Sequence, residues 1–460
     1  MMNVRGRHIL IVGLGKSGIA AARFVAQAGA LVTVTDRREE ASLREACAAL
    51  ASWPMTFHCG GHAEADFLGA ELIIVSPGVP LTLPPLQAAR QRGIPIVGEM
   101  ELALPYVHCP LVAIIGTNGK STTTKLAGDL FRQHGEAVVV GGNIGVPLLE
   151  VTEQLTTATR VVLEVSSYQV EITPHLHPAI TVLLNVTPDH LDRYPNFAAY
   201  MAAKKALIDR LGETDTVITN RRDPIAAEMA GTSRARPLFF NAVHRELPEH
   251  DHACWDGKRI HVRLPGQPAM TIPCHHPAMA VRHLCENFLA AALVGALARV
   301  PAATMTVAMD RFAMLPHRCQ LVSEWQGIRF YDDSKGTNVG AVACALESIA
   351  GPIVLIAGGE DKETGFEALQ GPVQRWVKHL VLLGQAREVM AQALSSSAPV
   401  TRVTTMHEAV RAAMAVAERG DAILLSPACA SFDMYANYAE RGRDFVQCVQ
   451  TCTGHAGTGH

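Results

Sequence analysis

The chain lacks the features that mark membrane proteins and nucleic-acid-binding proteins. Its 460 residues contain no basic stretch, their formal net charge is −3, and no apolar run approaches the roughly eighteen residues of a membrane span. These absences exclude a predicted membrane helix and argue against a general attraction to polyanions. Residues Met1–Arg7 show no secretory signal before the first apolar strand. We expect a cytoplasmic protein with no membrane insertion and no nucleic-acid partner.

The eleven cysteines also lack the paired spacing of a disulfide framework. Cys59 and Cys109 stand alone, and Cys448 and Cys452 lie far from any histidine-rich ligand set. This pattern fits isolated thiols in a cytosolic enzyme better than a disulfide framework. The histidine pair at 275–276 is interpreted as part of a surface or loop rather than as a metal site.

The most informative stretch joins a buried strand to a helix through a glycine-rich turn. Val112–Ile115 is apolar and mostly β-branched, Gly116–Lys120 is the turn, and Ser121–Phe131 has a helical pattern. This is the context that a phosphate-binding loop requires. Its glycines let backbone N–H groups approach phosphate oxygens, the helix N-terminus favours anions, and Lys120 can reach the outer phosphates. The alternative is an ordinary strand-turn-helix with a surface lysine.

A second glycine motif lies near the N-terminus. The strand His8–Val12 leads into Gly13–Gly18 with the pattern G-x-G-x-x-G, and a second strand, Leu31–Thr35, ends at Asp36. Taken alone, this β-α-β unit predicts a dinucleotide site and leaves a nicotinamide-dependent dehydrogenase as an alternative. The same geometry also suits any nucleotide diphosphate.

The succession of strands and helices predicts an α/β protein of three domains, each with a mostly parallel sheet. We expect a Rossmann-like domain at 1–98, a P-loop ATPase-like domain at 99–314 and a second Rossmann-like domain at 315–460. The end of the chain is polar and rich in glycine. We therefore expect a frayed tail over about 451–460.

A carboxylate at the end of a predicted buried strand indicates a metal site. Glu164 ends the strand Arg160–Glu164, and an unpaired charge in that position is expensive. A Mg²⁺ ion bound by both Glu164 and the phosphate loop would compensate this buried charge. His190, just past the strand Ala179–Asn185, is a candidate second ligand. The alternative for Glu164 is a strand edge that faces water.

The chain contains four long motifs: Gly116–Thr122, Gly141–Gly145, Leu163–Gln169 and Asp189–Tyr194. Together they resemble the Mur ligases, and the resemblance extends over roughly Ile9 to Phe445. Two further motifs, Asp333–Asn338 and Leu425–Asp433, resemble the D-glutamate-adding branch of that family. Folylpolyglutamate synthase shares the loop and the two later domain types but lacks the N-terminal domain. A sibling ligase for another amino acid is a further alternative, against which the last motif argues.

The resemblance implies a reaction, its substrates and its cofactors. ATP would phosphorylate the carboxylate of UDP-N-acetylmuramoyl-L-alanine, the amine of D-glutamate would attack the acyl phosphate, and phosphate would leave. ATP, Mg²⁺ at two sites and a monomeric enzyme are the corresponding expectations. A non-catalytic relative would be expected to lack Lys120, Glu164, His190 or Lys204, and all four are present.

The resemblance also implies a role for individual residues. The catalytic residues would be Lys120, Glu164, His190 and Lys204. The metal ligands would be Ser121, Glu164, His190 and Lys204 as its carbamate. ATP would be bound by Gly116, Thr117, Asn118, Gly119, Lys120, Ser121, Thr122, Asn287, Arg318, Asp333 and Lys335. The other substrates would be bound by Lys16, Ser17, Arg37, Ser76, Gly78, Asn143, His190, Thr337, Lys362, Ser431 and Phe432.

Two positions leave questions that the motifs alone do not answer. Leu284 stands where the family commonly has an asparagine that contacts adenine, whereas Asn287 is kept. Lys205 is adjacent to Lys204, and the preceding alanines favour Lys204 as the modified residue. Without the resemblance, either lysine would be interpreted as a residue on a helix surface.

Overall fold

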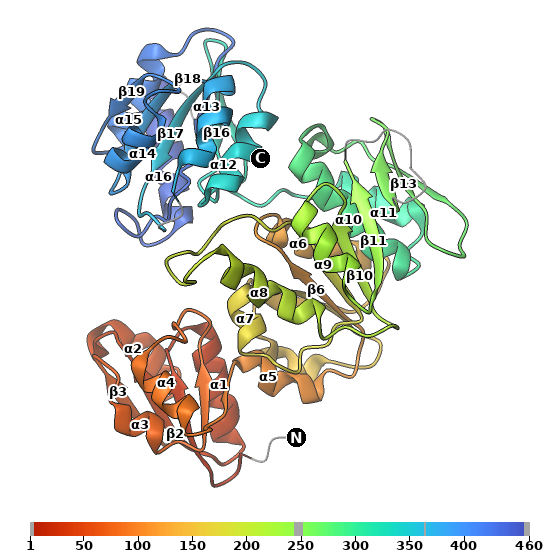
Figure 1. The fold of residues 1–460 in the computed structure, drawn as a ribbon, viewed down its shortest axis with the longest axis vertical. Helices are drawn as coiled ribbons and strands as arrows, with labels where there is room; N and C mark the ends of the chain where they lie inside the picture. The colour runs from red at the N-terminus through yellow and green to blue at the C-terminus, as the bar shows by residue number, and fades with distance from the viewer. Residues whose placement is uncertain (1–3, 243–251, 363–364, 455–460) are drawn as a thin grey trace.

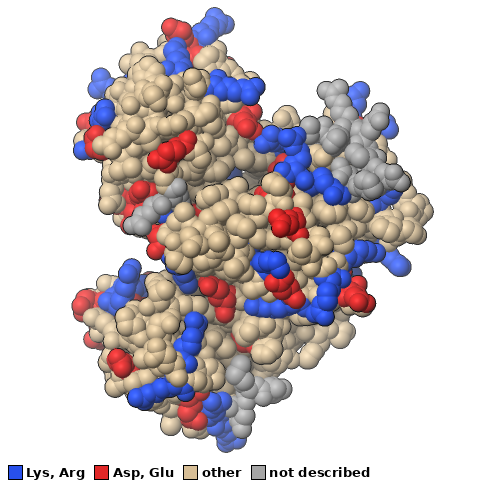
Figure 2. Space-filling model, in the orientation of Figure 1, with Lys and Arg blue, Asp and Glu red and all other residues tan. Residues whose placement is uncertain are grey.

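The computed structural model describes residues 4–242, 252–362 and 365–454. It contains three α/β units that follow one another along the long axis of the molecule, from the N-terminal unit in red to the C-terminal unit in blue (Figure 1). No helix in these ranges has the length and apolarity needed to cross a membrane. Acidic and basic side chains are interspersed over the face shown in Figure 2.

The N-terminal unit is a parallel sheet of five strands in the order β3-β2-β1-β4-β5. The strands are β1 His8–Val12, β2 Leu31–Asp36, β3 Met55–Cys59, β4 Leu72–Val75 and β5 Ile96–Val97, and the helices are α1 Lys16–Gln27, α2 Glu40–Ala48, α3 Glu64–Leu68 and α4 Pro84–Gln91. The strand order reverses between β1 and β4, which pair in parallel. The loops that follow these two strands therefore form the crevice where such sheets bind ligands.

The central unit is built on a nine-stranded sheet in the order β14-β13-β12-β11-β10-β9-β6-β8-β7. Its strands are β6 Leu111–Ile115, β7 Val138–Gly142, β8 Arg160–Glu164, β9 Ile180–Leu183, β10 Thr216–Asn220, β11 Arg236–Asn241, β12 Ala253–Trp255, β13 Arg259–Val262 and β14 Met270–Pro273. Among these described strands, the pairs β12 with β13 and β13 with β14 are antiparallel, and the other pairs are parallel. Because β6 lies between β8 and β9, the residues that follow these three strands meet at one edge of the sheet.

Helices cover the central sheet and lead away from that edge. They are α6 Lys120–Gln133, α7 Ser167–Glu171, α8 Phe197–Ile208, α9 Pro224–Gly231, α10 Arg282–Leu297 and α11 Ala302–Asp310. α10 is buried along most of its length and packs with α6 in one apolar cluster with residues of the central strands. This packing fixes the helix that begins at the phosphate loop.

The third unit has six strands in the order β15-β16-β20-β17-β18-β19. They are β15 Gln320–Trp325, β16 Ile328–Asp332, β17 Ile353–Gly358, β18 Val377–Leu383, β19 Val400–Arg402 and β20 Ala422–Leu425, with the helices α12 Val339–Ser348, α13 Gln370–Trp376, α14 Arg387–Leu394, α15 Met406–Val416 and α16 Tyr438–Thr453. All pairs are parallel except β15 with β16. The predicted fold class, three mostly parallel α/β units, is confirmed, while the exact boundaries at 98 and 314 stay predictions.

The predicted start of the frayed tail at 451 is wrong. Thr451 and Thr453 belong to α16, and their hydroxyls donate to the carbonyls of Gln447 and Val449, both at 2.9 Å. Threonines can satisfy their hydroxyl groups in this way inside a helix, so a polar composition does not by itself end one. The helix instead ends at Gly454, whose φ of 67° is left-handed. Residues 455–460 lie outside the described ranges.

A buried carboxyl group lies in the short helix α5 (Glu99–Ala103), which joins the first two units. The Oε1 atom of Glu99 accepts the backbone N–H of Leu149 at 2.6 Å, and burial raises the pKa of this carboxyl group to about 7. The ordinary pKa is 4.5, so the folded protein retains a proton that the unfolded chain releases. Stability therefore falls as the pH rises from 4.5 to about 7, by about 3 kcal/mol.

Replacing Glu99 by glutamine is expected to remove this pH dependence, because the amide oxygen keeps the bond from Leu149 and cannot ionise. The variant should be more stable than the parent at pH 8 and about equal to it at pH 4.5. Chemical denaturation at the two pH values measures the difference. The exposed neighbour Glu153, changed to glutamine, is the control. An unchanged slope of stability against pH in Glu99→Gln would contradict the assignment.

Candidate active site

The phosphate loop is held in the conformation that its glycines permit. Gly116 and Gly119 have φ values of 144° and 86°, and Gly119 caps the N-terminus of α6. A Cβ atom on Gly116 would come within 3.3 Å of the backbone of Asn185. Lys120 folds back over the loop, and its Nζ donates to the carbonyls of Gly116 at 3.1 Å and Thr117 at 2.8 Å. Its ammonium group thus lies against the loop that is predicted to wrap phosphate groups.

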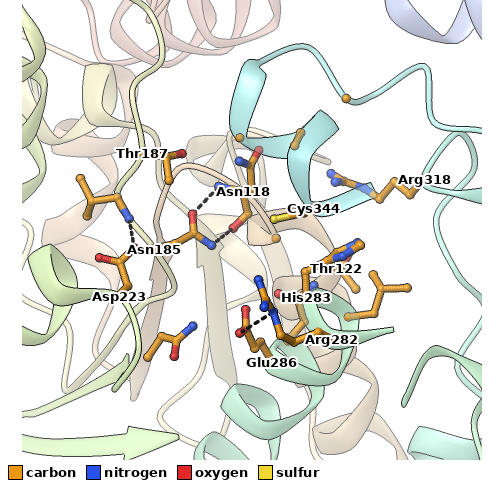
Figure 3. A pocket seen from close by; sticks show the side chains of 18 of the residues that line it. Asn118, Thr122, Asn185, Thr187, Asp223, Arg282, His283, Glu286, Arg318 and Cys344 are labelled. Carbon is orange, nitrogen blue, oxygen red and sulfur yellow. Dashed lines mark hydrogen bonds and ion pairs between the residues drawn. The ribbon is translucent and has the colours of Figure 1, made fainter. Parts of the chain in front are cut away.

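Asn185, just past β9, supports this loop and was not predicted as a site residue. Its Oδ1 accepts the N–H groups of Thr117 at 3.1 Å and Asn118 at 2.8 Å, while its Nδ2 donates to the carbonyl of Asn118 at 3.1 Å. Figure 3 shows the side chain directed at the loop. The signal in the sequence was a polar residue after a buried strand.

Glu164 is buried beside the loop with one of its oxygens unsatisfied. Oε1 accepts the Nδ2 group of Asn143 at 2.7 Å, but Oε2 is buried and has no hydrogen-bond partner in the described ranges. The buried hydroxyl of Thr122 is also without a partner there. Such groups are normally satisfied by protein, water or an ion, so each of these two oxygens can take a further partner.

Lys204 of α8 is almost completely buried, with 2% exposure. Its Nζ donates to the carbonyl of Gly116 at 2.8 Å, the same carbonyl that Lys120 contacts, and lies 4.5 Å from the ring centre of Tyr200. Burial, and then the neighbouring charge of Lys120, lower the pKa of Lys204 well below its usual value. Lys204 is therefore a buried amine, whereas the side chain of Lys205 is 39% exposed and pairs with Asp209.

His190 has a left-handed backbone, with φ 57°, which is uncommon for a residue other than glycine. Its ring packs edge-on against the ring of Tyr168, with 5.0 Å between the ring centres. Its Nε2 atom lies 3.6 Å from Oδ2 of Asp189. Burial lowers the pKa of His190 to about 4 against the opposing charge of Asp189. The imidazole is neutral near pH 7, as a metal ligand must be.

Asp189 joins the third unit to the central unit. Its Oδ1 accepts from Nζ of Lys362 at 3.1 Å, and its Oδ2 accepts from Nδ2 of Asn338 at 3.0 Å. Asn338 also exchanges hydrogen bonds with Asn118 of the phosphate loop, at 3.0 and 3.2 Å. Burial raises the pKa of Asp189, but Lys362, His190 and Lys120 together outweigh burial and the net shift is downward. The third unit therefore contacts the loop and the segment after β9 directly.

A cavity of about 370 Å³ lies between the central and third units, and we call it the interdomain cavity. Figure 3 shows labelled side chains from both units around it, including Asn118, Thr122 and Arg318. It is lined by these predicted ATP-binding residues: Asn118, Gly119, Thr122, Asn287, Arg318, Asp333 and Lys335. It is also lined by Leu284, the departure from the family pattern, and by His283, Glu286 and Cys344, which were not predicted.

The acidic and basic groups of the third unit in this cavity have shifted pKa values. Asp333 accepts from the hydroxyl of Ser426 at 2.7 Å and from the N–H of Cys319 at 3.1 Å, and burial raises its pKa to about 7. Burial, followed by the charge of Arg318, lowers the pKa of Lys335 to about 8. Its ammonium lies 3.8 Å from the ring centre of Tyr438.

A second cavity, of about 960 Å³, lies over the loops that follow β1 and β4, and we call it the N-terminal cavity. Its lining contains the predicted residues Lys16, Ser17, Arg37, Ser76, Gly78 and Asn143. Asn143 lines this cavity and also donates to Glu164. The side-chain amide of Asn143 therefore connects the N-terminal cavity to the carboxylate beside the phosphate loop.

Asp36 explains why the glycine motif of the N-terminal unit is not a dinucleotide site of the usual kind. Its carboxylate accepts the N–H of Leu14 at 2.8 Å and a fork of bonds from Arg38. Burial raises the pKa, but the hydrogen bonds of Arg38 and Leu14 outweigh it and hold the pKa at about 2. The acid that would contact a ribose hydroxyl in a dehydrogenase is thus engaged by the protein itself.

The residues predicted to bind D-glutamate come together only in part. An isolated bridge between Glu360 and Ala430 joins the loops that carry Lys362 and Ser431, and Ser431 is buried. Phe432 is 68% exposed and lines neither cavity, and Thr337 is half-buried before Asn338.

Arg441 of α16 ties the loops of the third unit together. Its guanidinium donates to the carbonyls of Ser334 at 2.9 Å and Ala430 at 3.0 Å, and also to the hydroxyl of Ser334 and the carbonyl of Cys429. The loop before α12 and the loop after β20 are therefore fixed to each other by the last helix in the described chain.

The fold and the site define a three-domain protein with a glycine-rich loop of the phosphate-binding type and a cavity between its second and third domains. Three family models match it: the Mur ligase middle domain over residues 114–295, the Mur ligase MurD-like N-terminal domain over 7–98 and the Mur ligase glutamate ligase domain over 317–429. The chain belongs to the Mur ligase family.

The branch of the family follows from curated relatives. The chain is 43% identical over 448 residues to the UDP-N-acetylmuramoylalanine–D-glutamate ligase of Geobacter metallireducens, covering 97% of this chain and 98% of that one. It is 41% identical to the ligase of the same name from Geobacter sp. strain M21, with 98% of each chain covered. These relatives place the chain in the UDP-N-acetylmuramoylalanine–D-glutamate ligase branch.

Solved structures agree on the fold. The UDP-N-acetylmuramate–alanine ligase of Thermotoga maritima matches with a TM-score of 0.58 at 17% identity, covering 97% of this chain and 100% of that chain. A pseudomurein peptide ligase type C from Methanothermus fervidus matches with a TM-score of 0.59 at 16% identity and the same coverage.

Proposed function

We propose that the chain is an ATP-dependent ligase that joins D-glutamate to UDP-N-acetylmuramoyl-L-alanine in peptidoglycan precursor synthesis. The observation that carries this proposal is the position of Glu164, which lies beside the phosphate loop and is hydrogen-bonded to a residue of the N-terminal cavity. A nucleotide on the loop and a second substrate in that cavity would meet there. The names of the relatives supply the substrates and product.

The reaction needs positioning more than covalent chemistry from the protein. A carboxylate oxygen of the UDP-linked substrate attacks the γ-phosphorus of ATP, and ADP leaves. The amine of D-glutamate then attacks the acyl carbon, loses a proton, and the C–O bond to phosphate breaks. Lys120 and the N–H groups from Gly116 to Thr122 would hold the phosphates. Asn143 would orient the acceptor carboxylate. Such alignment and charge neutralisation account for much of the rate in reactions of this kind.

The residues of the site fit Mg²⁺, as the unsatisfied oxygen of Glu164 and hydroxyl of Thr122 indicate. No group of three or more His, Cys, Asp or Glu side chains in the described ranges could hold a metal alone. This agrees with Mg²⁺, which commonly binds one or two carboxylates together with substrate phosphates and water. We assign Ser121 and Glu164 to one ion, and His190 with the carbamate of Lys204 to a second. Bound there, Mg²⁺ would neutralise charge on the phosphate oxygens.

Lys204 would carry its carbamate because a buried, neutral amine is the form that reacts with CO₂. The Nζ atom forms a bond to the carbon of CO₂ and releases one proton, which turns a basic side chain into an anion. The change would replace one of the two basic side chains that donate to the carbonyl of Gly116 by an anion. It would also give the second metal site a negative ligand.

The remaining residues are assigned to the three substrates. Asn287, Arg318 and Asp333 would bind ATP, with Asp333 at the ribose, and Leu284 would give the base an apolar contact in place of a hydrogen bond. Lys335 would lie near the phosphates and the D-glutamate. Lys16, Ser17, Arg37, Ser76 and Gly78 would bind the uridine diphosphate. Thr337, Lys362, Ser431 and Phe432 would bind D-glutamate, for which Phe432 must move from its exposed position.

Changing Lys362 to alanine is expected to weaken the use of D-glutamate far more than the formation of the acyl phosphate. Lys362 would supply the positive charge that binds a D-glutamate carboxylate. In the structure its ammonium group forms an ion pair with Asp189. We expect the KM for D-glutamate to rise about 100-fold, in line with loss of a charge-assisted bond. Hydroxylamine trapping without D-glutamate measures the acyl phosphate. Equal loss of both activities would contradict the role.

The proposed function is tested by phosphate release from ATP with UDP-N-acetylmuramoyl-L-alanine as acceptor. D-Glutamate is compared with L-glutamate, L-alanine and diaminopimelate. Release that depends on D-glutamate alone supports the proposal, and release with another amino acid assigns the chain to a different ligation. We also propose a cytoplasmic monomer, which size-exclusion chromatography with light scattering and cell fractionation test directly.

A further inference from the structure

A six-residue segment, Asp189–Tyr194, contacts all three units of the molecule, and we call it the junction segment. It follows β9 in the central unit. Towards the third unit, Asp189 binds the side chains of Asn338 and Lys362, and the N–H of Asp192 donates to the carbonyl of Lys362 at 3.1 Å. The contacts with the third unit thus engage both the side chains and the backbone of the segment.

Towards the N-terminal unit, the junction segment makes its contact through Arg193. Nη1 donates to the carbonyl of Pro77 at 2.7 Å and Nη2 donates to the carbonyl of Val79 at 3.1 Å. Both carbonyls belong to the loop after β4, and Pro77, Gly78 and Val79 line the N-terminal cavity. One guanidinium therefore holds two points of the loop on which the UDP-linked substrate is proposed to lie.

The other side of the same guanidinium faces the reaction centre. The guanidinium carbon, Cζ, lies 3.6 Å from the ring centre of Tyr168. The Tyr168 ring in turn lies edge-on to the ring of His190, with 5.0 Å between the two ring centres. The backbone N–H of Arg193 also donates to the carbonyl of His190 at 3.0 Å. A chain of direct contacts thus runs from the carbonyls of Pro77 and Val79 through Arg193 and Tyr168 to His190.

We propose that Arg193 is a positioning residue that fixes the N-terminal cavity relative to His190 and the phosphate loop. The proposal rests on the proposed function. The UDP-linked substrate is anchored in one unit and must react in another, and a misplacement of about 1 Å can lower a rate about a hundredfold. The planar fork of arginine can grip two carbonyls and stack on an aromatic ring at once, which lysine cannot do.

The test compares Arg193→Ala and Arg193→Lys with a matched control. Arg210 makes the same kind of paired bond, to the carbonyls of Thr173 at 2.7 Å and Val170 at 3.0 Å, but wholly inside the central unit. We expect both Arg193 variants to lower kcat at least tenfold while the KM for the UDP-linked substrate and the Kd for ADP change less than threefold. Arg210→Ala should lower the Tm and leave kcat within threefold.

Amide hydrogen exchange at Ser76, Gly78 and Val79, the residues of 76–80 that carry a backbone N–H, supplies a readout that does not depend on activity. Both Arg193 variants should exchange faster there than the parent protein, and Arg210→Ala should not. Arg193→Lys serves if the alanine variant fails to fold. Unchanged exchange in 76–80, or a raised KM with an intact kcat, would overturn the proposal.

The two proposals can fail separately. If the parent protein releases no phosphate with any amino acid, the proposed function fails, and the exchange of residues 76–80 still decides whether Arg193 holds this loop. If the parent protein is active and the Arg193 variants exchange faster without loss of kcat, the proposed function stands and the positioning role is rejected.

Discussion

Replacing Lys204 by methionine is expected to lower kcat on the order of a thousandfold while the protein remains folded. Methionine fills nearly the same volume, and it removes a buried amine that donates to the carbonyl of Gly116. The effect on catalysis is large because an anionic carbamate beside the phosphate loop would be lost, and preorganised charges of this kind contribute about 10²–10³ in kcat. Stability should change little, since a buried amine with a lowered pKa contributes little favourable charge interaction.

The matched control is Lys205→Met, one residue further along α8. Lys205 is exposed and pairs with Asp209, so this variant should retain kcat within about twofold, as surface pairs contribute little. Steady-state phosphate release gives kcat, and intact mass spectrometry at neutral pH gives the mass of a carbamate on the parent protein. Similar losses in the two variants would contradict the assignment of Lys204.

Replacing Glu164 by glutamine is expected to lower kcat by about a hundredfold or more and to raise the Mg²⁺ concentration for half-maximal activity at least tenfold. The side chain keeps an oxygen for the Nδ2 group of Asn143, so packing is preserved. It loses the anionic oxygen that has no partner in the described ranges, and a neutral amide is a much poorer ligand for Mg²⁺.

The control for Glu164 is a carboxylate that pairs with the other end of the same strand. Glu136 pairs with Arg160, which begins β8, the strand that Glu164 ends. Glu136→Gln should affect stability and leave the Mg²⁺ dependence unchanged. Calorimetric titration of ADP at several Mg²⁺ concentrations measures the dependence without turnover. A Glu164→Gln variant with the parent's Mg²⁺ dependence would show that Glu164 has no part in metal binding.

The parts of the fold that depend on local pattern could be predicted from the sequence. The strand before the phosphate loop, the glycine turn and the start of the following helix all lie where the spacing of residues 112–131 indicated. The buried position of Glu164 at the end of its strand was also predicted. These features depend on neighbouring residues, so one segment of sequence contains the whole signal.

The parts of the site that depend on distant contacts could not be predicted in this way. Asn338 meets Asn118 across 220 positions of sequence, and Arg193 meets Pro77 across 116. The role of Asp36 depended on whether Arg38 would occupy its carboxylate, which the G-x-G-x-x-G spacing does not reveal. Lys204 was singled out only through the family, because a lysine on a helix gives no sign of burial by itself.

The position of Arg441 has a consequence for the order in which the chain acquires activity during synthesis. All five strands of the N-terminal sheet come from residues 8–97, so that sheet can form while later segments are still being translated. The loops at Ser334 and Ala430 cannot be fixed to each other until α16 has emerged and Arg441 bridges them. A ribosome-bound chain that lacks α16 can therefore hold a folded N-terminal sheet, while the N-terminal cavity still lacks Tyr438 of α16 and the third domain is incomplete.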